Sequence, residues 1–225
     1  MRALHSKLAI QINEKVYKKD PLTSELGEKI LREGIDMIES IGFENFTFRK
    51  LAKNINSTEA SIYRYFESKH YLLTYLTMWY WNWMEYRIVM ATLNIEDPKT
   101  QLRNAVKCLT EEIEEDLEVH QIDEAKLQRI VIIESSKIYQ CKSVDVDNAA
   151  GFFKVYKQLV HRVAEIILKI NPKYKYPHML VSTIIEGVHH QRFFANHLPR
   201  LTDIIEGEDA VTSFYKQLIE RELKF

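Results

Sequence analysis

The sequence predicts an all-α fold, and three observations lead to this prediction. Its 225 residues include six Gly and five Pro, too few for the many tight turns of a β-sandwich or barrel. Apolar residues recur at steps of three and four along most of the chain, which is the spacing of a helix with one buried face. Breaks such as Asp97-Pro98 and Asn171-Pro172 separate these stretches.

Composition places the chain among ordinary globular proteins of the cytoplasm. Hydrophobic residues make up 46% and charged residues 28%, which excludes collagen-like and wholly disordered chains. The net charge of −1 gives no whole-molecule attraction to nucleic acid or membrane. Cys108 and Cys141 lie far apart without CxxC spacing, so we expect reduced thiols, no disulfide framework and no zinc site.

No segment predicts export or a membrane span. The N-terminal residues alternate polar and apolar types and lack the continuous apolar core of a signal peptide. Residues 72–93 are apolar and long enough to span a bilayer, but Glu85 and Arg87 lie near their middle. A central charge costs about 2.5–3.5 kcal/mol on insertion, so a buried helix and a cytoplasmic protein without membrane contact are expected.

Residues 1–22 predict a short N-terminal extension with an extra helix. Leu4, Leu8, Ile12 and Val16 form a narrow apolar stripe that ends before Asp20-Pro21. Its role is open between an added helix on a dimer and a flexible arm that contacts phosphate through lysines. Those lysines are Lys15, Lys18 and Lys19.

The next helix and two short ones form a predicted three-helix unit over residues 23–70. Thr23 or Ser24 can cap the first helix, and Gly42 suits its C-terminal end. Short helices over residues 48–55 and 59–66 must pack against a neighbour, because a helix of two turns is unstable alone in water.

The two short helices read as a helix-turn-helix. On the first, the inward positions are Leu51, Ala52 and Ile55. Asn56 suits the turn because Asn tolerates positive φ, and Thr58 can cap the second helix. That helix would bury Ile62 and Phe66 and present its other face to a DNA major groove.

Longer helices are predicted for the rest of the chain, which we take as a second domain over residues 71–225. Pro177, Pro199 and Gly207 mark breaks between them. The expected helices span residues 68–93, 98–119, 122–140, 148–170, 177–197 and 208–222.

Residues 46–70 combine a local positive charge with a recurrent motif. Five basic residues stand there against two acidic ones. The motif residues are Thr47, Leu51-Ala52, Asn56-Ser57-Thr58, Ala60, Ser61-Ile62-Tyr63, Phe66 and Ser68-Lys69. Over residues 24–76 this stretch resembles the N-terminal domain of the TetR (tetracycline repressor) family of bacterial transcription regulators. It departs from the family pattern at Asn56, where Gly is usual, and at Ser57, where an apolar residue is usual.

The resemblance implies roles for individual residues on double-stranded DNA. Base contacts are implied for Arg49, Ser61 and Arg64, and an Arg to guanine pair discriminates by about 1–3 kcal/mol. Phosphate contacts are implied for Thr47, Tyr63, Tyr65 and Lys69. Glu59 has an open role, since a carboxylate near DNA repels phosphate unless it accepts from cytosine. The DNA-binding set is Thr47, Arg49, Lys50, Thr58, Glu59, Ser61, Tyr63, Arg64, Tyr65 and Lys69.

An aromatic-rich helix follows the motif and has two readings. Its aromatic side chains fall on more than one face, which is typical of plain core. Alternatively, some of them line a pocket for a small apolar or aromatic effector, and His190 stands at its rim. The pocket set is Trp79, Trp83, Tyr86 and His190.

The last two helices are expected to form a dimer interface, as the resemblance implies. Two copies related by a two-fold axis would place one helix-turn-helix on each half of a pseudo-palindromic operator. The interface set is Ile184, Ile185, Val188, Ile219 and Leu223. His189, His190 and His197 lack the spacing of a metal motif, so we expect pocket or interface histidines and no metal.

We therefore expect a homodimeric transcription regulator, a repressor released from its operator by a small-molecule effector, with no cofactor and no catalytic residues. The alternative is a helical enzyme or small-molecule carrier whose N-terminal hairpin is structural. Against an enzyme, the sequence holds no phosphate-binding glycine loop, GxSxG element or Cys-His signature. Operator sequence, effector identity, and repressor versus activator cannot be read from the sequence.

Overall fold

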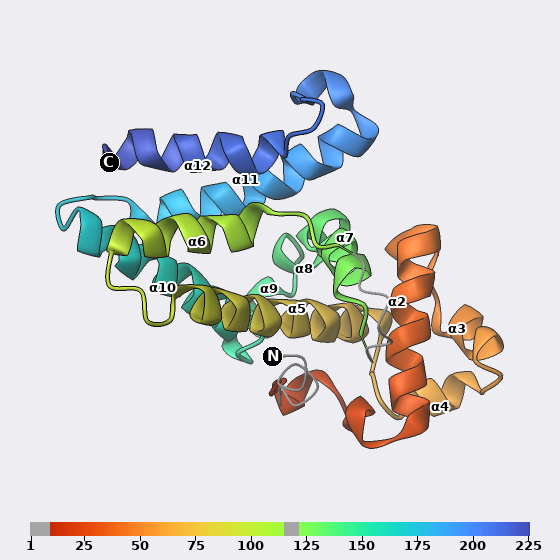
Figure 1. Cartoon of the computed structure of the whole chain (residues 1–225). Coiled ribbons are helices and arrows are strands. Elements are labelled where there is room, and N and C mark those ends of the chain that lie inside the picture. Colours follow the sequence, from red (N-terminus) through yellow and green to blue (C-terminus); the bar gives the residue numbers. More distant parts are fainter. Residues whose placement is uncertain (1–9, 115–121) are drawn as a thin grey trace. The chain divides into compact units, whose positions relative to one another are not determined.

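The structure is a computed structural model that describes residues 10–114 and 122–225. Within these ranges every regular element is helical and no strand occurs, so the all-α prediction is confirmed. Figure 1 shows the elements in chain order. They are η1 (Glu14–Val16), η2 (Pro21–Thr23), α2 (Glu25–Asn45), α3 (Phe48–Asn54), α4 (Glu59–Tyr63), α5 (Lys69–Thr92), α6 (Pro98–Thr110), α7 (Glu124–Glu134), α8 (Ser136–Tyr139), α9 (Val144–Ala149), α10 (Lys154–Ile170), α11 (Pro177–His197), η3 (Pro199–Leu201) and α12 (Ala210–Leu223).

The chain packs as two compact units that differ from the three predicted segments. Unit 1 comprises residues 1–82 and 113–153, and unit 2 comprises residues 83–112 and 154–225. The first helical turns of α5 and the helices α7 to α9 thus belong to the same unit as the three-helix part. No helix in the described part of the chain is both long and apolar enough to cross a membrane.

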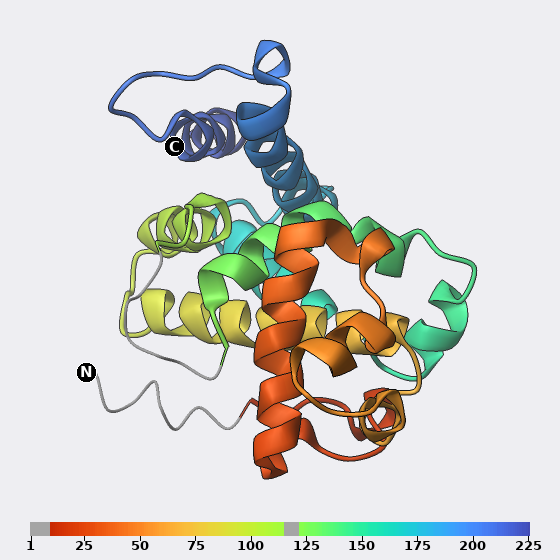
Figure 2. The same cartoon turned by 90° about the vertical axis from the view of Figure 1, so that its right-hand side faces the viewer.

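In unit 1, α2 packs against η2, α3 and α7, and α3 packs against α4 (Figures 1 and 2). The Ser24 hydroxyl caps α2 by accepting from the Gly27 N–H at 3.3 Å. Gly42 adopts φ +74°, so the regular helix is interrupted there as the sequence suggested. The C-terminal end of α2 is also held by α7, because the carboxylate of Glu134, the last residue of α7, accepts from the Phe43 N–H at 2.9 Å.

The N-terminal segment does not match the predicted extra helix. Leu4 and Leu8 lie outside the described residues, and residues 10–20 hold only the 3₁₀ turn η1. Val16 is buried, the Lys18 N–H donates to the Tyr65 carbonyl at 2.8 Å, and Tyr17 packs edge-on against Tyr75. Residues 14–19 are therefore part of unit 1 and do not form a flexible arm.

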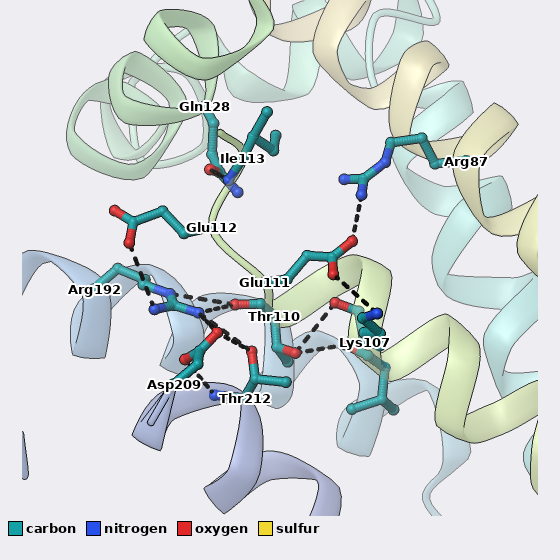
Figure 3. A network of polar contacts seen from close by, with 11 residues as sticks. Arg87, Lys107, Thr110, Glu111, Glu112, Ile113, Gln128, Arg192, Asp209 and Thr212 are labelled. Atoms are coloured by element: carbon teal, nitrogen blue, oxygen red, sulfur yellow. Dashed lines mark hydrogen bonds and ion pairs between the residues drawn. The ribbon is translucent and has the colours of Figure 1, made fainter. Parts of the chain in front are cut away.

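In unit 2, α10 packs against α6 and α11, and α12 packs against α6 and α11. Figure 3 shows one arginine joining three of these segments. The Arg192 guanidinium of α11 donates to the carbonyl of Thr110, the last residue of α6, and to the carboxylate of Asp209, which caps α12. The helix end, the cap and the arginine therefore form one polar junction.

Several predicted helices are shorter than expected. The helix predicted over residues 98–119 ends at Thr110, and the one predicted over residues 122–140 divides into α7 and α8. The one predicted over residues 148–170 begins at Lys154, because Gly151 takes φ +91° and separates α9 from α10. Hydrophobic periodicity continues across such breaks and so does not locate them.

His189 on α11 makes the stability of the protein sensitive to acid. Burial, with a smaller contribution from His190, lowers the pKa of His189 from 6.5 to about 4. The unfolded chain therefore binds a proton that the folded chain resists as pH falls from about 6.5 to 4. We expect the free energy of unfolding to fall by about 3 kcal/mol over that range.

Denaturant unfolding at a series of pH values measures this effect. His189→Phe should reduce the fall in the free energy of unfolding at acid pH, whereas substitution of the exposed His197 by Gln should leave that fall unchanged. If His189→Phe loses as much stability in acid as the wild type, the pH dependence comes from other groups.

Candidate nucleic-acid interface

The helix-turn-helix is built from α3, a turn at Asn56, and α4. Thr47 caps α3 by accepting from the Lys50 N–H at 3.2 Å, and Thr58 caps α4 by accepting from the Ser61 N–H at 3.1 Å. Asn56 adopts φ +54°, so it takes the left-handed conformation that the sequence predicted for the turn. The expected caps and turn residue are therefore confirmed.

Both short helices are held by buried apolar side chains. Leu51, Ala52 and Ile55 from α3 are at most 4% exposed, and Ile62 and Phe66 have no exposed surface. The Lys29 ammonium of α2 donates to the Ile55 carbonyl at 3.1 Å and satisfies one acceptor at the C-terminal end of α3. This packing gives helices of seven and five residues the support that they lack alone.

Most of the predicted DNA-binding side chains lie at the surface of this hairpin. The exposed residues are Thr47, Arg49, Lys50, Thr58, Tyr63 and Arg64, and Glu59 and Ser61 are half-buried. Within the described ranges, no residue forms a hydrogen bond or ion pair with the Arg49 side chain. A guanidinium without an intramolecular partner keeps all its donors for a ligand.

Three of the exposed residues are already oriented by neighbours. The Arg64 guanidinium donates to the Ser61 hydroxyl at 3.2 Å, which places both predicted base-contacting groups on one side of α4. Tyr63 packs edge-on against Phe48 with ring centroids 5.1 Å apart. The Lys50 ammonium instead donates back to the Asn45 carbonyl at 2.8 Å, so it must leave that acceptor to reach DNA.

Tyr65 does not take the predicted place at the surface. It is 3% exposed, and its hydroxyl is hydrogen-bonded to the Ser24 hydroxyl at 2.8 Å and lies 3.4 Å from the Lys19 ammonium. Tyr65 therefore joins the N-terminal segment and the cap of α2 to the hairpin. Its ring has no surface with which to contact phosphate.

Lys69 also has a different role from the predicted phosphate contact. Its ammonium donates to three backbone carbonyls, those of Phe43 at 2.8 Å, Glu44 at 3.1 Å and Phe46 at 3.1 Å. It also lies 4.6 Å from the centre of the Phe43 ring. All three ammonium donors are occupied. Lys69, the first residue of α5, therefore connects α5 to the C-terminal end of α2 through these hydrogen bonds.

Of the four predicted effector residues, Trp79, Trp83 and Tyr86 lie on α5 and His190 lies on α11, and none of them lines the pocket described below. Trp83 is covered by the Arg87 guanidinium, 4.7 Å from its ring centre, and Arg87 in turn pairs with Glu111. Trp79, Trp83 and Tyr86 are half-buried and His190 is exposed.

Unit 2 contains a pocket of about 500 Å³ that sequence reasoning missed. Arg162 and Glu85 form an ion pair of 2.7 Å at this pocket. Eight of its nine lining residues are of polar or charged types, in contrast to the predicted apolar site, and they come from α5, α6 and α10, so no local motif marks the pocket. The lining residues are Glu85, Thr92, Gln101, Gln158, His161, Arg162, Glu165, Ile166 and Lys169.

The residues predicted for the dimer interface lie in the core of unit 2. Ile184, Ile185, Val188 and Ile219 are at most 3% exposed and Leu223 is 6% exposed. A side chain buried within one subunit cannot supply the surface that a second subunit contacts. The exposed apolar side chains on the same helices are Met179, Phe214 and Leu218.

Comparisons with known proteins agree with the hairpin and the fold. Residues 30–76 match a family described as "Bacterial regulatory proteins, tetR family". No curated protein matches the sequence.

Solved structures with the same fold include a putative tetR family transcription regulator from Shewanella sp. PV-4, with TM-score 0.62, 16% identity, and coverage of 87% of this chain and 96% of that one. AibR in complex with isovaleryl coenzyme A and operator DNA gives TM-score 0.56, 14% identity, and coverage of 85% and 95%. The ketosteroid transcriptional regulator KstR2 of Mycobacterium tuberculosis gives TM-score 0.56, 16% identity, and coverage of 97% of both chains.

Proposed function

Because residues 30–76 form an N-terminal domain of the tetR family of bacterial regulatory proteins, we propose that this DNA-binding regulator is a homodimeric repressor released by a small molecule. The main support for DNA contact is the exposed face of α3 and α4. Among residues 10–114 and 122–225 Arg49 has no hydrogen-bond or ion-pair partner, and on the same hairpin the Arg64 guanidinium donates to the Ser61 hydroxyl. Charged and hydroxyl donors of this kind read base edges in a major groove.

Dimerisation is supported by the exposed apolar side chains of the last helices. Phe214 and Leu218 are four residues apart on α12 and 56% and 36% exposed, so they share one helix face. Burial of such a face against a symmetry mate would remove apolar area from water and place two hairpins on one operator. The proposed interface uses these residues in place of the buried set.

Effector release is supported by the pocket in unit 2. Its ion-paired, polar lining favours a small polar or charged molecule over the apolar one first expected. AibR, which has the same fold, has been solved with both operator DNA and isovaleryl coenzyme A. A ligand releases the operator only if it binds the two conformations of the protein with different affinity.

Selection of bound duplexes from a random pool tests the proposed function. Enrichment of a pseudo-palindromic sequence would support a protein that binds DNA as a dimer. If no sequence is enriched even at low salt, the proposal of a transcription regulator is wrong.

Arg49→Ala is expected to relax sequence preference by about 1–3 kcal/mol at one base pair of each half-site, because a bidentate contact to a base edge is lost. Affinities of wild type and variant for the selected duplex and for single-base changes measure this. The control is Arg200→Ala, an exposed arginine of η3 outside the hairpin and outside the proposed interface, which should leave the preference unchanged. Equal loss on all duplexes would instead make Arg49 a phosphate contact.

A further inference from the structure

Three potential metal ligands from separate segments of unit 1 meet beside the first turn of α5. His70 lies in that turn, Cys141 in the connection between α8 and α9, and Asp147 in α9. One ligand atom from each residue lies within 4.8 Å of the other two. His70 and Asp147 are 77 residues apart in the sequence, so no spacing motif could reveal the cluster.

The geometry is close to what a tetrahedral ion requires. His70 Nε2 and Asp147 Oδ2 are 3.2 Å apart. Nitrogen and carboxylate ligands lie about 2.0–2.2 Å from Zn²⁺, so two ligands at a tetrahedral angle are about 3.3–3.5 Å apart. These two atoms need to move by only a few tenths of an ångström, whereas the thiol must approach further.

The thiol reaches the carboxylate through a chain of hydrogen bonds. Cys141 Sγ is 3.2 Å from the Ser143 hydroxyl, which donates to Asp147 Oδ2 at 2.9 Å. Cys141 precedes α9 in a turn and is half-buried, so a rotation of its side chain can replace the hydroxyl beside Asp147. Ser143 then remains a hydrogen-bond partner of the ligating carboxylate, as outer groups do in metal sites.

Burial and donor type define what this cluster can hold. Asp147 is 3% exposed, and His70 is half-buried, so an ion has a protected carboxylate and an open side for entry. One imidazole, one thiolate and one carboxylate suit a transition metal, because Mg²⁺ and Ca²⁺ select oxygen ligands. We propose that His70, Cys141 and Asp147 bind one Zn²⁺-like divalent transition-metal ion, with water in the fourth position.

On binding, the Cys141 thiol releases its proton to solvent and the sulfur bonds to the ion. The proton on His70 Nε2 is given up to solvent and the neutral ring carries its proton on Nδ1, so that Nε2 and Asp147 Oδ2 each bond to the metal in place of their hydrogen bond. The ion would link α9 to the first turn of α5, directly after Lys69. It would thereby hold in place the segment that follows the hairpin in the chain.

Cobalt titration of the full-length, chelator-treated protein tests the site. We expect one Co²⁺ per chain, a thiolate-to-cobalt charge-transfer absorption in the near ultraviolet, and displacement of Co²⁺ by Zn²⁺. Cys141→Ser should abolish the absorption, and Asp147→Asn should weaken binding at least tenfold. Two controls should behave as wild type: Cys108→Ser, the other free cysteine, and His178→Ala, which removes a histidine pair in unit 2.

Cys141→Ser is the decisive variant because it replaces a half-buried thiol by a hydroxyl of similar size and is expected to fold. Circular dichroism of each variant checks the fold before titration. No charge-transfer absorption in wild type, or an absorption that persists in Cys141→Ser, would overturn the proposal. Loss of binding in His178→Ala would place the ion in unit 2 and would also overturn it.

Discussion

Lys69→Met is expected to lower the free energy of unfolding by about 3–5 kcal/mol. The lysine ammonium donates to the carbonyls of Phe43, Glu44 and Phe46, and methionine offers none of these hydrogen bonds. A buried acceptor left without a partner costs about 1–3 kcal/mol, and the partial exposure of these carbonyls keeps the total below three full penalties. The sequence motif alone would suggest a loss of DNA affinity with unchanged stability.

Denaturant unfolding of the variant beside Lys53→Met separates these two outcomes. Lys53 is an exposed lysine of α3, and its substitution should change stability by no more than about 0.5 kcal/mol. DNA affinity against salt, measured where Lys69→Met is still folded, should keep the wild-type slope. Wild-type stability together with a slope reduced by about one unit would instead make Lys69 a phosphate contact.

Local features of the hairpin could be predicted because neighbouring residues determine them. A Thr before a helix caps the N–H three residues on, as both Thr47 and Thr58 do. Asn56 accepts positive φ because its short side chain tolerates it. Apolar spacing identified the buried side chains of α3 and α4, since a face is fixed by positions within one short helix.

Features that depend on distant segments could not be predicted in the same way. The motif contains Tyr65 and Lys69, but only the folded chain shows that Tyr65 contacts Ser24 and Lys69 contacts the end of α2. The residues predicted for the dimer interface are buried within the subunit for a related reason. Apolar spacing marks residues such as Ile184 that seek burial, and it does not distinguish burial in the same subunit from burial against a partner.

The polar pocket and the metal-ligand cluster also could not be predicted from the sequence, because their residues lie far apart in the chain. Arg162 and Glu85 are 77 positions apart, so their ion pair leaves no spacing signal. A charge pattern read along one helix would assign both residues to a solvated face. Sites assembled by tertiary packing can be inferred only from the structure, whereas the helix-turn-helix carries its own signal.

In unit 2 the most consequential substitution concerns Arg192, whose side chain is 12% exposed. Two of its nitrogens donate to the Thr110 carbonyl, at 3.2 and 2.5 Å, and one of these nitrogens also donates to the Asp209 carboxylate at 2.7 Å. The last carbonyls of a helix have no partner within it. Arg192 satisfies one of them at the end of α6 and neutralises the capping carboxylate of α12 (Figure 3).

Arg192→Met is expected to lower the free energy of unfolding by about 2–4 kcal/mol, because the carbonyl of the buried Thr110 loses its partner and the Asp209 carboxylate, which is 38% exposed, loses a charge-assisted hydrogen bond. Arg221→Met, at an exposed position of α12, is the matched control and should be nearly neutral. Denaturant unfolding of both variants at neutral pH measures the difference. Equal stability of the two variants would show that the junction contributes nothing.

The pH dependence of the same variants identifies the interaction that is lost. Burial alone would raise the pKa of the Asp209 carboxyl, but hydrogen bonds from Arg192 and Thr212 hold it below its ordinary value of 3.8. In the wild type this carboxylate therefore contributes stability above about pH 3.8, and the contribution is lost as pH falls through the lowered pKa. Without Arg192 only the hydrogen bonds from Thr212 oppose the effect of burial, so the pKa of Asp209 should rise and the loss of stability in acid should begin at higher pH. If Arg192→Met loses stability over the same acid pH range as the wild type, then Arg192 does not lower the pKa of Asp209.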